Sequence, residues 1–270
     1  MQIGIDVGAT KIESVVLEED GNEKHRSRTA CPKDYLAIIN TIRDIHNKLE
    51  KEFKTELPIG VCHPGIHSPQ TGLVKNAPNC AWLEKKPFQG DLRKALGKEV
   101  FCENDGNCFA LSEAIDGSGK HYKIVYGIIL GSGAGGGLVI DKQIVSGPNG
   151  VAGEWGHNQI PYFAAKKENF SSNNAREAEV ESFVSGLGIA KRFNKIYGKN
   201  LRTNEIFELN RKHDLDAERF IDEFKLNLAM SLSQIINILD PDAFVFGGGV
   251  SNEIDFLSEI ESMVKKFVIG

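Results

Sequence analysis

The stretch QIGIDVGATKIESVVL, residues 2–17, decides the fold. Apolar residues largely alternate with polar or small ones on both sides of a turn that contains Gly8, which predicts two strands joined by a tight hairpin. A second turn, Asp20-Gly21-Asn22, leads into a third strand, EKHRSRT. Residues 2–30 are therefore expected to form a three-stranded meander.

The same layout recurs at an offset of roughly 125 residues in YKIVYGIILGSGAGGGLVIDKQIVSG, residues 122–147. Each copy has a glycine-rich first turn and is followed by helix and strand patterns, including the long apolar stripe of residues 217–239. This repeat predicts two similar lobes, over residues 1–115 and 116–270, with a ligand cleft between them.

Composition and charge narrow the function classes. The chain has 270 residues, of which 41% are hydrophobic and 26% charged, and its formal net charge is -5. Scattered lysines and arginines give no basic surface for nucleic acid or an anionic membrane. Since no apolar window is long enough for a membrane helix, we expect a cytoplasmic protein. Five cysteines without C-x-x-C spacing indicate reduced thiols.

Three glycine-rich turns follow apolar strands. The first lies in DVGATK from Asp6, the second in LGSGAGGG from Leu130 and the third in FGGGVS from Phe246. Backbone N–H groups exposed in such turns can hold phosphate oxygens, and Asp6 can hold the magnesium ion that accompanies a nucleotide. Each turn alone is also compatible with a plain hairpin or loop, but together they favour a nucleotide clamp. Ser251 is expected to cap the last helix.

Two polar segments offer catalytic or binding groups. Asn104 and Asp105 stand where a strand gives way to a helix. Asp105 is therefore either a helix N-cap or a general base for a hydroxyl that attacks phosphate. In GEWGHNQIPYF, Glu154 and His157 lie three residues apart. From the residues alone, His157 is open to three interpretations: a metal ligand, a proton-transfer group or a core side chain.

The motifs DVGATK, ENDGN, GSGAGGG, GEWGH, ESFVSG and PDAFVFGGGVS occur in the order found in one family. Over residues 2–252 the chain resembles the ROK sugar kinases, which are relatives of hexokinase and actin. The text between the motifs most resembles the bacterial fructokinase/mannokinase branch. The resemblance implies an α/β fold of two ribonuclease-H-like lobes (actin/hexokinase-like) with an interlobe cleft.

The resemblance also implies roles for individual residues. Asp105 is expected to be the catalytic base. The groups expected to bind the sugar are Asn104, Glu154, His157, Glu181, Asn79 and Gly65. The groups expected to bind ATP and its magnesium are Asp6, Gly8, Ala9, Thr10, Lys11, Gly131, Ser132 and Gly133 around the phosphates, and Gly247, Gly248 and Gly249 beside the adenosine.

Members of this family often carry a zinc ion held by the histidine of the ExGH motif and three cysteines. Counting back from Glu181 puts Ser172, Asn174 and Glu179 where those cysteines would stand. Serine and asparagine supply no thiolate, so we expect no protein zinc site. The chain also ends at Gly270, short of the segment that the resemblance expects to complete the nucleotide lobe.

Together these features predict an ATP- and Mg²⁺-dependent kinase for the 6-hydroxyl of a hexose, with fructose as the first expectation. Kinases for glucose, mannose or an N-acetylhexosamine are the alternative. A ROK-type repressor is disfavoured because the first strand starts at residue 2 and the net charge is negative. A non-catalytic sugar-binding protein stays open. The expected partners are the sugar and ATP, without nucleic acid or membrane, and a homodimer is left open.

Overall fold

The structure is a computed structural model, which describes residues 1–161 and 176–269. The chain divides into two compact units: Met1–Cys108 with Ser146–Ala152, and Phe109–Val145 with Gly153–Gly270. Helix α3 (Asp105–Ile115) carries the chain from the first unit into the second. The sequence placed the boundary at the end of this helix, whereas the compact units divide inside it.

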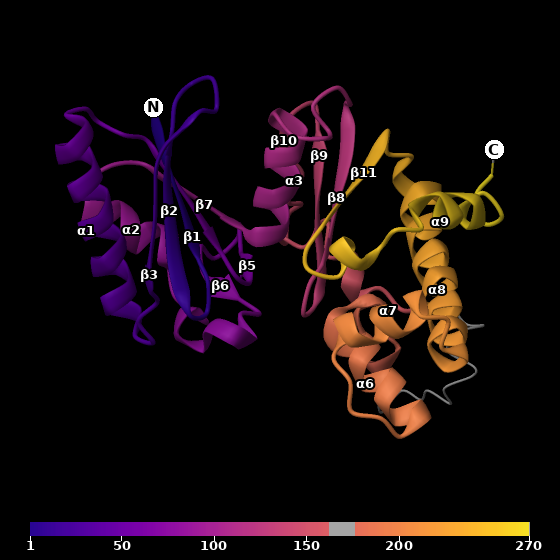
Figure 1. The fold of residues 1–270 in the computed structure, drawn as a ribbon. Coiled ribbons are helices and arrows are strands. Elements are labelled where there is room, and N and C mark those ends of the chain that lie inside the picture. The colour runs from indigo at the N-terminus through magenta and orange to yellow at the C-terminus, as the bar shows by residue number, and fades with distance from the viewer. Residues whose placement is uncertain (162–175, 270) are drawn as a thin grey trace. The chain divides into compact units, whose positions relative to one another are not determined.

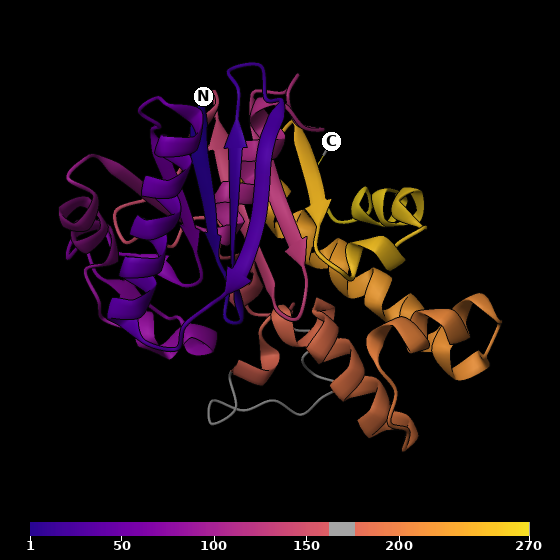
Figure 2. The same ribbon diagram turned by 60° about the vertical axis from the view of Figure 1, so that its left-hand side comes forward.

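The first unit is built on a five-stranded mixed sheet with the order β3-β2-β1-β4-β7. Its strands are β1 (Gln2–Val7), β2 (Lys11–Leu17), β3 (Glu23–Ala30), β4 (Ile59–His63) and β7 (Val100–Asn104). Strands β1 to β3 pair antiparallel, which confirms the predicted meander, whereas β4 and β7 run parallel to β1. Helices α1 (Tyr35–Phe53) and α2 (Phe88–Leu96) cover one face of the sheet (Figure 1, Figure 2).

The alternation along β1 forms the core of this unit. Ile3, Ile5 and Val7 are buried and pack in one cluster with Ile38 and Ile42 of α1. Burial of an aliphatic side chain stabilises the fold by about 1.5–3 kcal/mol. Three short elements follow β4: β5 (Ile66–His67), β6 (Val74–Lys75) and the 3-10 helix η1 (Pro78–Leu83).

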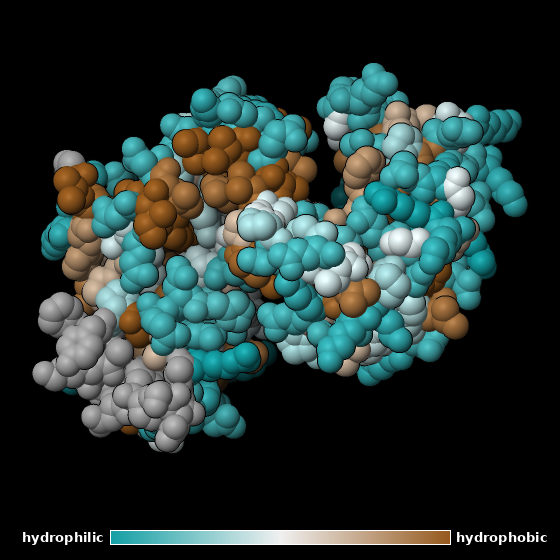
Figure 3. All heavy atoms as spheres, turned by 180° about the vertical axis from the view of Figure 1, so that it is seen from behind, coloured by the Kyte–Doolittle hydropathy of each residue, from teal (hydrophilic) through white to brown (hydrophobic). Residues whose placement is uncertain are grey.

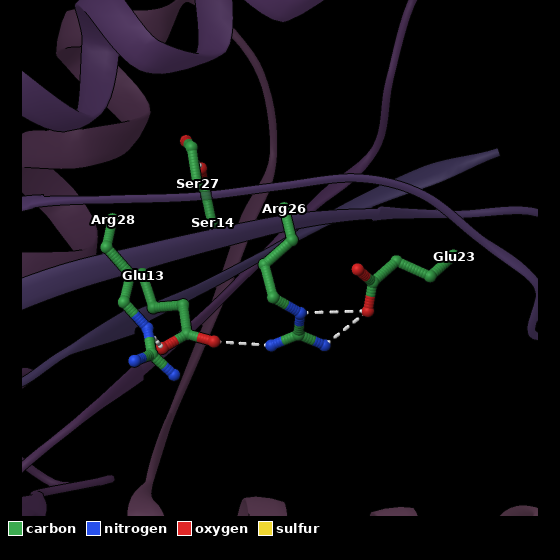
Figure 4. Close-up of polar contacts among 6 residues, drawn as sticks. All are labelled: Glu13, Ser14, Glu23, Arg26, Ser27 and Arg28. Atoms are coloured by element: carbon green, nitrogen blue, oxygen red, sulfur yellow. Dashed lines mark hydrogen bonds and ion pairs between the residues drawn. The ribbon is translucent and has the colours of Figure 1, made fainter.

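The outer strand of this sheet, β3, is strongly charged. The carboxylate of Glu13 on β2 accepts hydrogen bonds from Arg26 and, at 2.5 Å, from Arg28, and Arg26 also donates to Glu23 at 2.8 Å (Figure 4). Hydrogen bonds from Arg28 and Arg26 lower the pKa of Glu13. Charged residues on an edge strand discourage pairing with another chain, so this edge is protected.

The second unit repeats the strand order of the first in a four-stranded sheet, β10-β9-β8-β11. Its strands are β8 (Ile124–Leu130), β9 (Ala134–Ile140), β10 (Gln143–Ile144) and β11 (Ala243–Gly247). Strand β8 pairs antiparallel with β9 and parallel with β11, as β1 does with β2 and β4. The predicted repeat is therefore confirmed, and each glycine turn joins the first two strands of its sheet.

Helices pack on both faces of the second sheet (Figure 1). Val125 and Val139 face Ala110 and Ala114 of α3, whereas Tyr126 belongs to the larger core of the opposite face. Among the described residues after β10, this unit includes helices α5 (Glu181–Val184), α6 (Gly186–Tyr197), α7 (Thr203–Arg211), α8 (Leu215–Leu239) and α9 (Leu257–Val264), together with the 3-10 helices η2 (Trp155–His157) and η4 (Ser251–Glu253).

The expectation that Ser251 caps the last helix is wrong. Ser251 begins η4, and its hydroxyl donates to the carbonyl oxygen of Gly248 at 2.6 Å, while α9 starts only at Leu257. The serine hydroxyl is used for a hydrogen bond within the tight turn after β11, and the last helix begins only later in the chain.

Strand β11 lies at the edge of the second sheet, because β8 is its only partner among the described strands. Its sequence, AFVFG, is apolar throughout. Seen from behind, apolar side chains also gather on one area of this unit (Figure 3). The edge strand β11 is therefore apolar, whereas the edge strand β3 of the first sheet is charged. Within residues 1–161 and 176–269, no helix combines the length and apolar content needed to cross a membrane.

Candidate active site

The first glycine turn closes the β1–β2 hairpin. The N–H of Gly8 donates to the carbonyl oxygen of Lys11 at 2.9 Å, and the carbonyl of Thr10 accepts from Cys31 at 3.0 Å. The N–H of Gly8 is thus already used within the turn. Asp6, Thr10 and Lys11 are exposed, so a carboxylate, a hydroxyl and an ammonium group are presented at this end of the sheet.

Asp6 and Asn104 lie at the same end of the first sheet. Asp6 pairs with Cys62 of β4, and Asn104 at the end of β7 pairs with His63. Because β1, β4 and β7 are parallel, their carboxyl ends meet at one edge, where open α/β sheets bind ligands. The structure therefore brings the predicted metal-binding and catalytic carboxylates of this unit to one edge.

Asn104, not Asp105, caps helix α3. The Asn104 side-chain oxygen accepts from the N–H of Asn107 at 2.7 Å, as an N-cap residue does. Asp105 is the first helical residue, and its carboxylate accepts from the N–H of Gly106 at 2.9 Å. The capping interpretation of Asp105 is thus wrong, and the Asp105 carboxylate sits at the positive end of the helix.

The surrounding protein partly desolvates Asp105 although its side chain remains exposed at the surface. This desolvation, assisted by the nearby negative charge of Asp6, raises the pKa of the Asp105 carboxyl above its usual range. The hydrogen bond from Gly106 acts in the opposite direction. A carboxylate with a raised pKa is a stronger base than an ordinary aspartate.

The two softer candidates of the first unit lie beyond β4. Gly65 has φ +84°, and a Cβ atom there would lie 2.8 Å from the Cβ of Ala77, so only glycine fits. Asn79 is exposed in η1, two residues after Ala77. The segment around Ala77 thus packs against Gly65 and continues into Asn79, which places both residues in one part of the unit.

The second glycine turn is held by other elements of its unit. The carbonyl oxygens of Gly131 and Ser132 accept from the N–H groups of Gly186 (2.8 Å) and Leu187 (3.3 Å) at the start of α6. These bonds fix the plane of the turn. Within the described part of the chain, no group accepts from the N–H of Ser132 or Gly133, and both residues are exposed. The turn therefore offers two oriented N–H donors to an anion.

The third glycine turn packs directly against the second. The carbonyl oxygen of Leu130, next to Gly131, accepts from the N–H of Val250 at 2.8 Å. Gly248 has φ +90°, and a Cβ atom there would lie 2.5 Å from that same oxygen. A Cβ atom on Gly247 would lie 2.6 Å from the ring of Phe109. The structure thus brings together two of the three predicted nucleotide-binding turns.

The segment with Glu154 and His157 lies on strand β9, whose glycines make room for it. The buried indole of Trp155 donates to the carbonyl oxygen of Gly135 at 2.7 Å. A Cβ atom on Gly136 would lie 2.9 Å from the Trp155 ring, and one on Gly156 only 2.0 Å from the carbonyl oxygen of Ala134. These glycines serve close packing of backbone on backbone, and they position Glu154 and His157.

Glu181 contacts the second glycine turn. Its carboxylate accepts from the N–H of Ala134 at 2.8 Å, and a Cβ atom on Gly133 would lie 2.6 Å from the same oxygen. The predicted sugar ligand Glu181 is thus joined to the predicted phosphate turn within one unit. Glu154 is half-buried. The burial of Tyr126 raises the pKa of the Tyr126 hydroxyl, and the negative charge of Glu154 adds to this effect.

His157 pairs with Glu179, a residue for which the sequence suggested no role. The His157 Nδ1 atom lies 2.9 Å from the Glu179 carboxylate. The hydrogen bond with Glu179 raises the pKa of His157, and the charges of Glu154 and Glu181 add to the effect, against partial burial. A carboxylate two residues before Glu181 was the only sequence signal for this pair.

The residues described around His157 do not form a metal centre. In residues 1–161 and 176–269, no group of three or more histidine, cysteine, aspartate or glutamate side chains is arranged to hold a metal ion. Ser172 and Asn174, which replace two cysteines of the zinc-binding pattern, lie outside the described residues. Zinc binding would therefore need donors that neither serine nor asparagine supplies.

Residues 2–270 match the ROK family. The N-acetyl-D-glucosamine kinase of Haemophilus influenzae is 37% identical over 266 residues, which cover 96% of this chain and 87% of that protein. The solved ROK hexokinase of Thermus thermophilus superimposes with a TM-score of 0.87 at 23% identity, covering 98% of this chain and 88% of that one. A ROK family glucokinase of Streptomyces griseus, solved with glucose and AMPPNP, gives 0.75 at 26% identity and covers 100% and 90%. These likenesses confirm the hexokinase-like α/β fold.

The packing of the His157 segment predicts that alanine destabilises the protein at Gly156 but not at Gly135. We expect Gly156→Ala to lower the free energy of unfolding by about 1–3 kcal/mol, because the new methyl group meets the rigid carbonyl of Ala134. Gly135→Ala is the control, since nothing lies within 4 Å of its Cβ position. Urea unfolding measures both, and equal stability of the two variants would contradict the described packing.

Proposed function

The chain belongs to the ROK family, and on that premise we propose that it is an ATP-dependent sugar kinase that phosphorylates the 6-hydroxyl of a hexose. One observation carries the proposal: an exposed aspartate of raised pKa, Asp105, stands at the N-terminus of α3 beside the capping residue Asn104. A group placed in this way suits proton abstraction from a hydroxyl.

For the sugar, we favour N-acetylglucosamine. The relatives that resemble the chain at 33–37% identity bear the name N-acetyl-D-glucosamine kinase. Fructose, the first expectation from the sequence, finds no support among them. An N-acetylhexosamine was one of three alternatives expected from the sequence, beside glucose and mannose, and we now place it ahead of these two and of fructose.

The proposed reaction assigns one step to Asp105. Its carboxylate takes the proton of the 6-hydroxyl while that oxygen forms a bond to the γ-phosphorus of ATP. The bond between this phosphorus and the bridging oxygen of ADP breaks, and ADP leaves. The transferred group is stabilised mainly by positioning and by charge. Asn104 can hold the same stretch of backbone rigid, because its side chain caps the helix that Asp105 begins.

The phosphoryl donor, MgATP, is assigned to the glycine turns. The N–H groups of Ser132 and Gly133 belong to exposed residues and have no acceptor in the described part of the chain, so they suit phosphate oxygens. Asp6 offers an exposed carboxylate, the ligand type that Mg²⁺ prefers. The turn of Gly247 to Gly249 is assigned to the adenosine, with glycine at 248 because no side chain fits there.

The sugar hydroxyls are assigned to Glu154, His157 and Glu181. Carboxylates accept hydrogen bonds and a histidine can donate or accept, so together they can fix one orientation of a polyhydroxylated ring. Because Glu181 also holds the N–H of Ala134, it links sugar binding to the phosphate turn.

A sugar panel tests the substrate. We expect MgATP-dependent release of ADP with N-acetylglucosamine at a kcat/KM at least about tenfold above that with fructose, glucose or mannose, since a site that binds an amide rejects analogues lacking it. A coupled ADP assay measures each sugar, with ATP alone as the control. Preference for fructose would contradict the chosen sugar but not the kinase, whereas no ADP release with any hexose would refute the kinase.

Replacing the base tests the mechanism. We expect Asp105→Asn to lower kcat by about 10²- to 10⁴-fold, while the Kd for the sugar, measured by calorimetry, changes little. A raised pKa means that the ionised Asp105 costs stability at neutral pH, so the variant should unfold at the same or a higher urea concentration. Asp44→Asn, an exposed carboxylate on α1, serves as the control. Wild-type kcat in Asp105→Asn would exclude Asp105 as the base.

The raised pKa of Asp105 also predicts the acidic limb of the pH profile. The base must be ionised, so kcat/KM should be constant at high pH and fall tenfold per pH unit below the pKa of Asp105. Because desolvation and Asp6 raise that pKa, the midpoint should lie above about 3.9, the value of an ordinary aspartate. Initial rates at low sugar concentration measure it. A midpoint at or below the ordinary value, in protein that stays folded, would contradict this assignment.

A further inference from the structure

His157 of the GEWGH segment forms an ion pair with Glu179. The His157 Nδ1 atom and the Glu179 Oε2 atom lie 2.9 Å apart, and the side chains are 43% and 16% exposed. Among the described residues, none forms a hydrogen bond with the other ring nitrogen, Nε2. One edge of the imidazole thus bonds to Glu179, whereas the described part of the chain supplies no hydrogen-bond partner for the other edge.

The backbone fixes Glu179 relative to His157. Gln159 and Glu179 form an antiparallel β-bridge. The N–H of Ile160 donates to the carbonyl of Ala178 at 2.7 Å, and the N–H of Val180 donates to that of Asn158 at 2.8 Å. These bonds order the backbone on both sides of Glu179, so its Cα atom is fixed relative to the His157 segment and only the side-chain torsions remain to be ordered.

We propose that Glu179 is a positioning residue that holds the His157 imidazole with Nδ1 toward its carboxylate and Nε2 toward the sugar. The proposal rests on the proposed function, in which His157 binds sugar hydroxyls. A carboxylate only accepts hydrogen bonds, so Nδ1 carries a proton in the pair. Which ring nitrogen is protonated is thereby fixed by the partner of Nδ1, and Nε2 meets the sugar in one defined state.

Glu179 does here what a metal ion does for the corresponding histidine in the zinc-binding pattern. It stands at a position of that pattern where a cysteine is expected, and it occupies one ring nitrogen of His157 directly. The described residues around His157 do not fit zinc, because in residues 1–161 and 176–269 no three histidine, cysteine, aspartate or glutamate side chains are arranged to hold a metal ion. An ion pair of protein groups replaces metal ligation as the means of orienting the ring.

Two substitutions separate orientation from folding. Glu179→Ala removes the acceptor, and we expect the KM for N-acetylglucosamine to rise about tenfold or more, while kcat and the KM for MgATP change less than about twofold. Glu179→Gln keeps an acceptor oxygen and should recover most of the sugar affinity. Glu208→Ala, which removes a carboxylate paired with Lys212 on the surface of α7, is the matched control and should leave all constants unchanged.

An NMR spectrum of the imidazole nitrogens reads the orientation directly. In the wild type, the ¹⁵N signals of His157, assigned by their loss in His157→Gln, should show a protonated Nδ1, and this state should become mixed in Glu179→Ala. Elemental analysis of the purified protein should find no stoichiometric zinc. Unchanged ¹⁵N signals and an unchanged sugar KM in Glu179→Ala would overturn the proposal, as would one zinc ion per chain that Glu179→Ala releases.

The two proposals fail in different ways. A wild-type protein that phosphorylates no hexose refutes the proposed function, and the ¹⁵N spectrum still decides whether Glu179 holds His157. If Glu179→Ala does not fold, the spectrum of the wild-type protein decides: a protonated Nδ1 of His157 supports the proposal, and an unprotonated Nδ1 overturns it.

Discussion

The close approach of backbone to backbone at the end of β8 is the constraint on which the second unit depends. The carbonyl of Leu130 accepts from the N–H of Val250, and that of Gly131 accepts from the N–H of Gly186. Gly248 lies so close to the Leu130 oxygen that no side chain fits. Three segments far apart in sequence therefore meet without side chains between them, and they fix the turn whose N–H groups are assigned to phosphate.

The same kind of close backbone approach explains several of the 28 glycines of the chain. Gly131 and Gly133 belong to the exposed turn, whereas Gly136 lies within β9 beneath Trp155. From the sequence, GSGAGGG is one glycine-rich motif. In the structure it has two parts: the first is the exposed turn that we assign to phosphate, and the second lets the segment with Glu154 and His157 lie on the sheet. The groups proposed to bind phosphate and those proposed to bind sugar are thus positioned by one motif.

Much of the fold could be predicted, because its signals are local. Alternating apolar residues and tight turns predict both meanders, and the apolar stripe of α8 predicts a long helix. The errors concern which of two neighbouring residues makes a contact, and which residues far apart in the sequence pair with one another. Asn104 rather than Asp105 caps α3, because only the Asn104 oxygen reaches the N–H of Asn107. Glu179 was recognised only as a missing cysteine, since its pairing with His157 depends on a bridge between segments about twenty residues apart.

Charge is distributed differently in the two units. In the first, Asp6 and Asp105 lie near enough for one to raise the pKa of the other, which favours a base. In the second, the carboxylates of Glu154, Glu179 and Glu181 raise the pKa of His157, and Glu179 bonds to it directly. The central claim is that Asp105 takes the proton of the sugar. A crystal structure with N-acetylglucosamine and a non-hydrolysable ATP analogue tests it most directly. The account predicts the 6-hydroxyl oxygen within about 2.6–3.2 Å of the Asp105 carboxylate, and an ordered sugar whose 6-hydroxyl points away from Asp105 would contradict it.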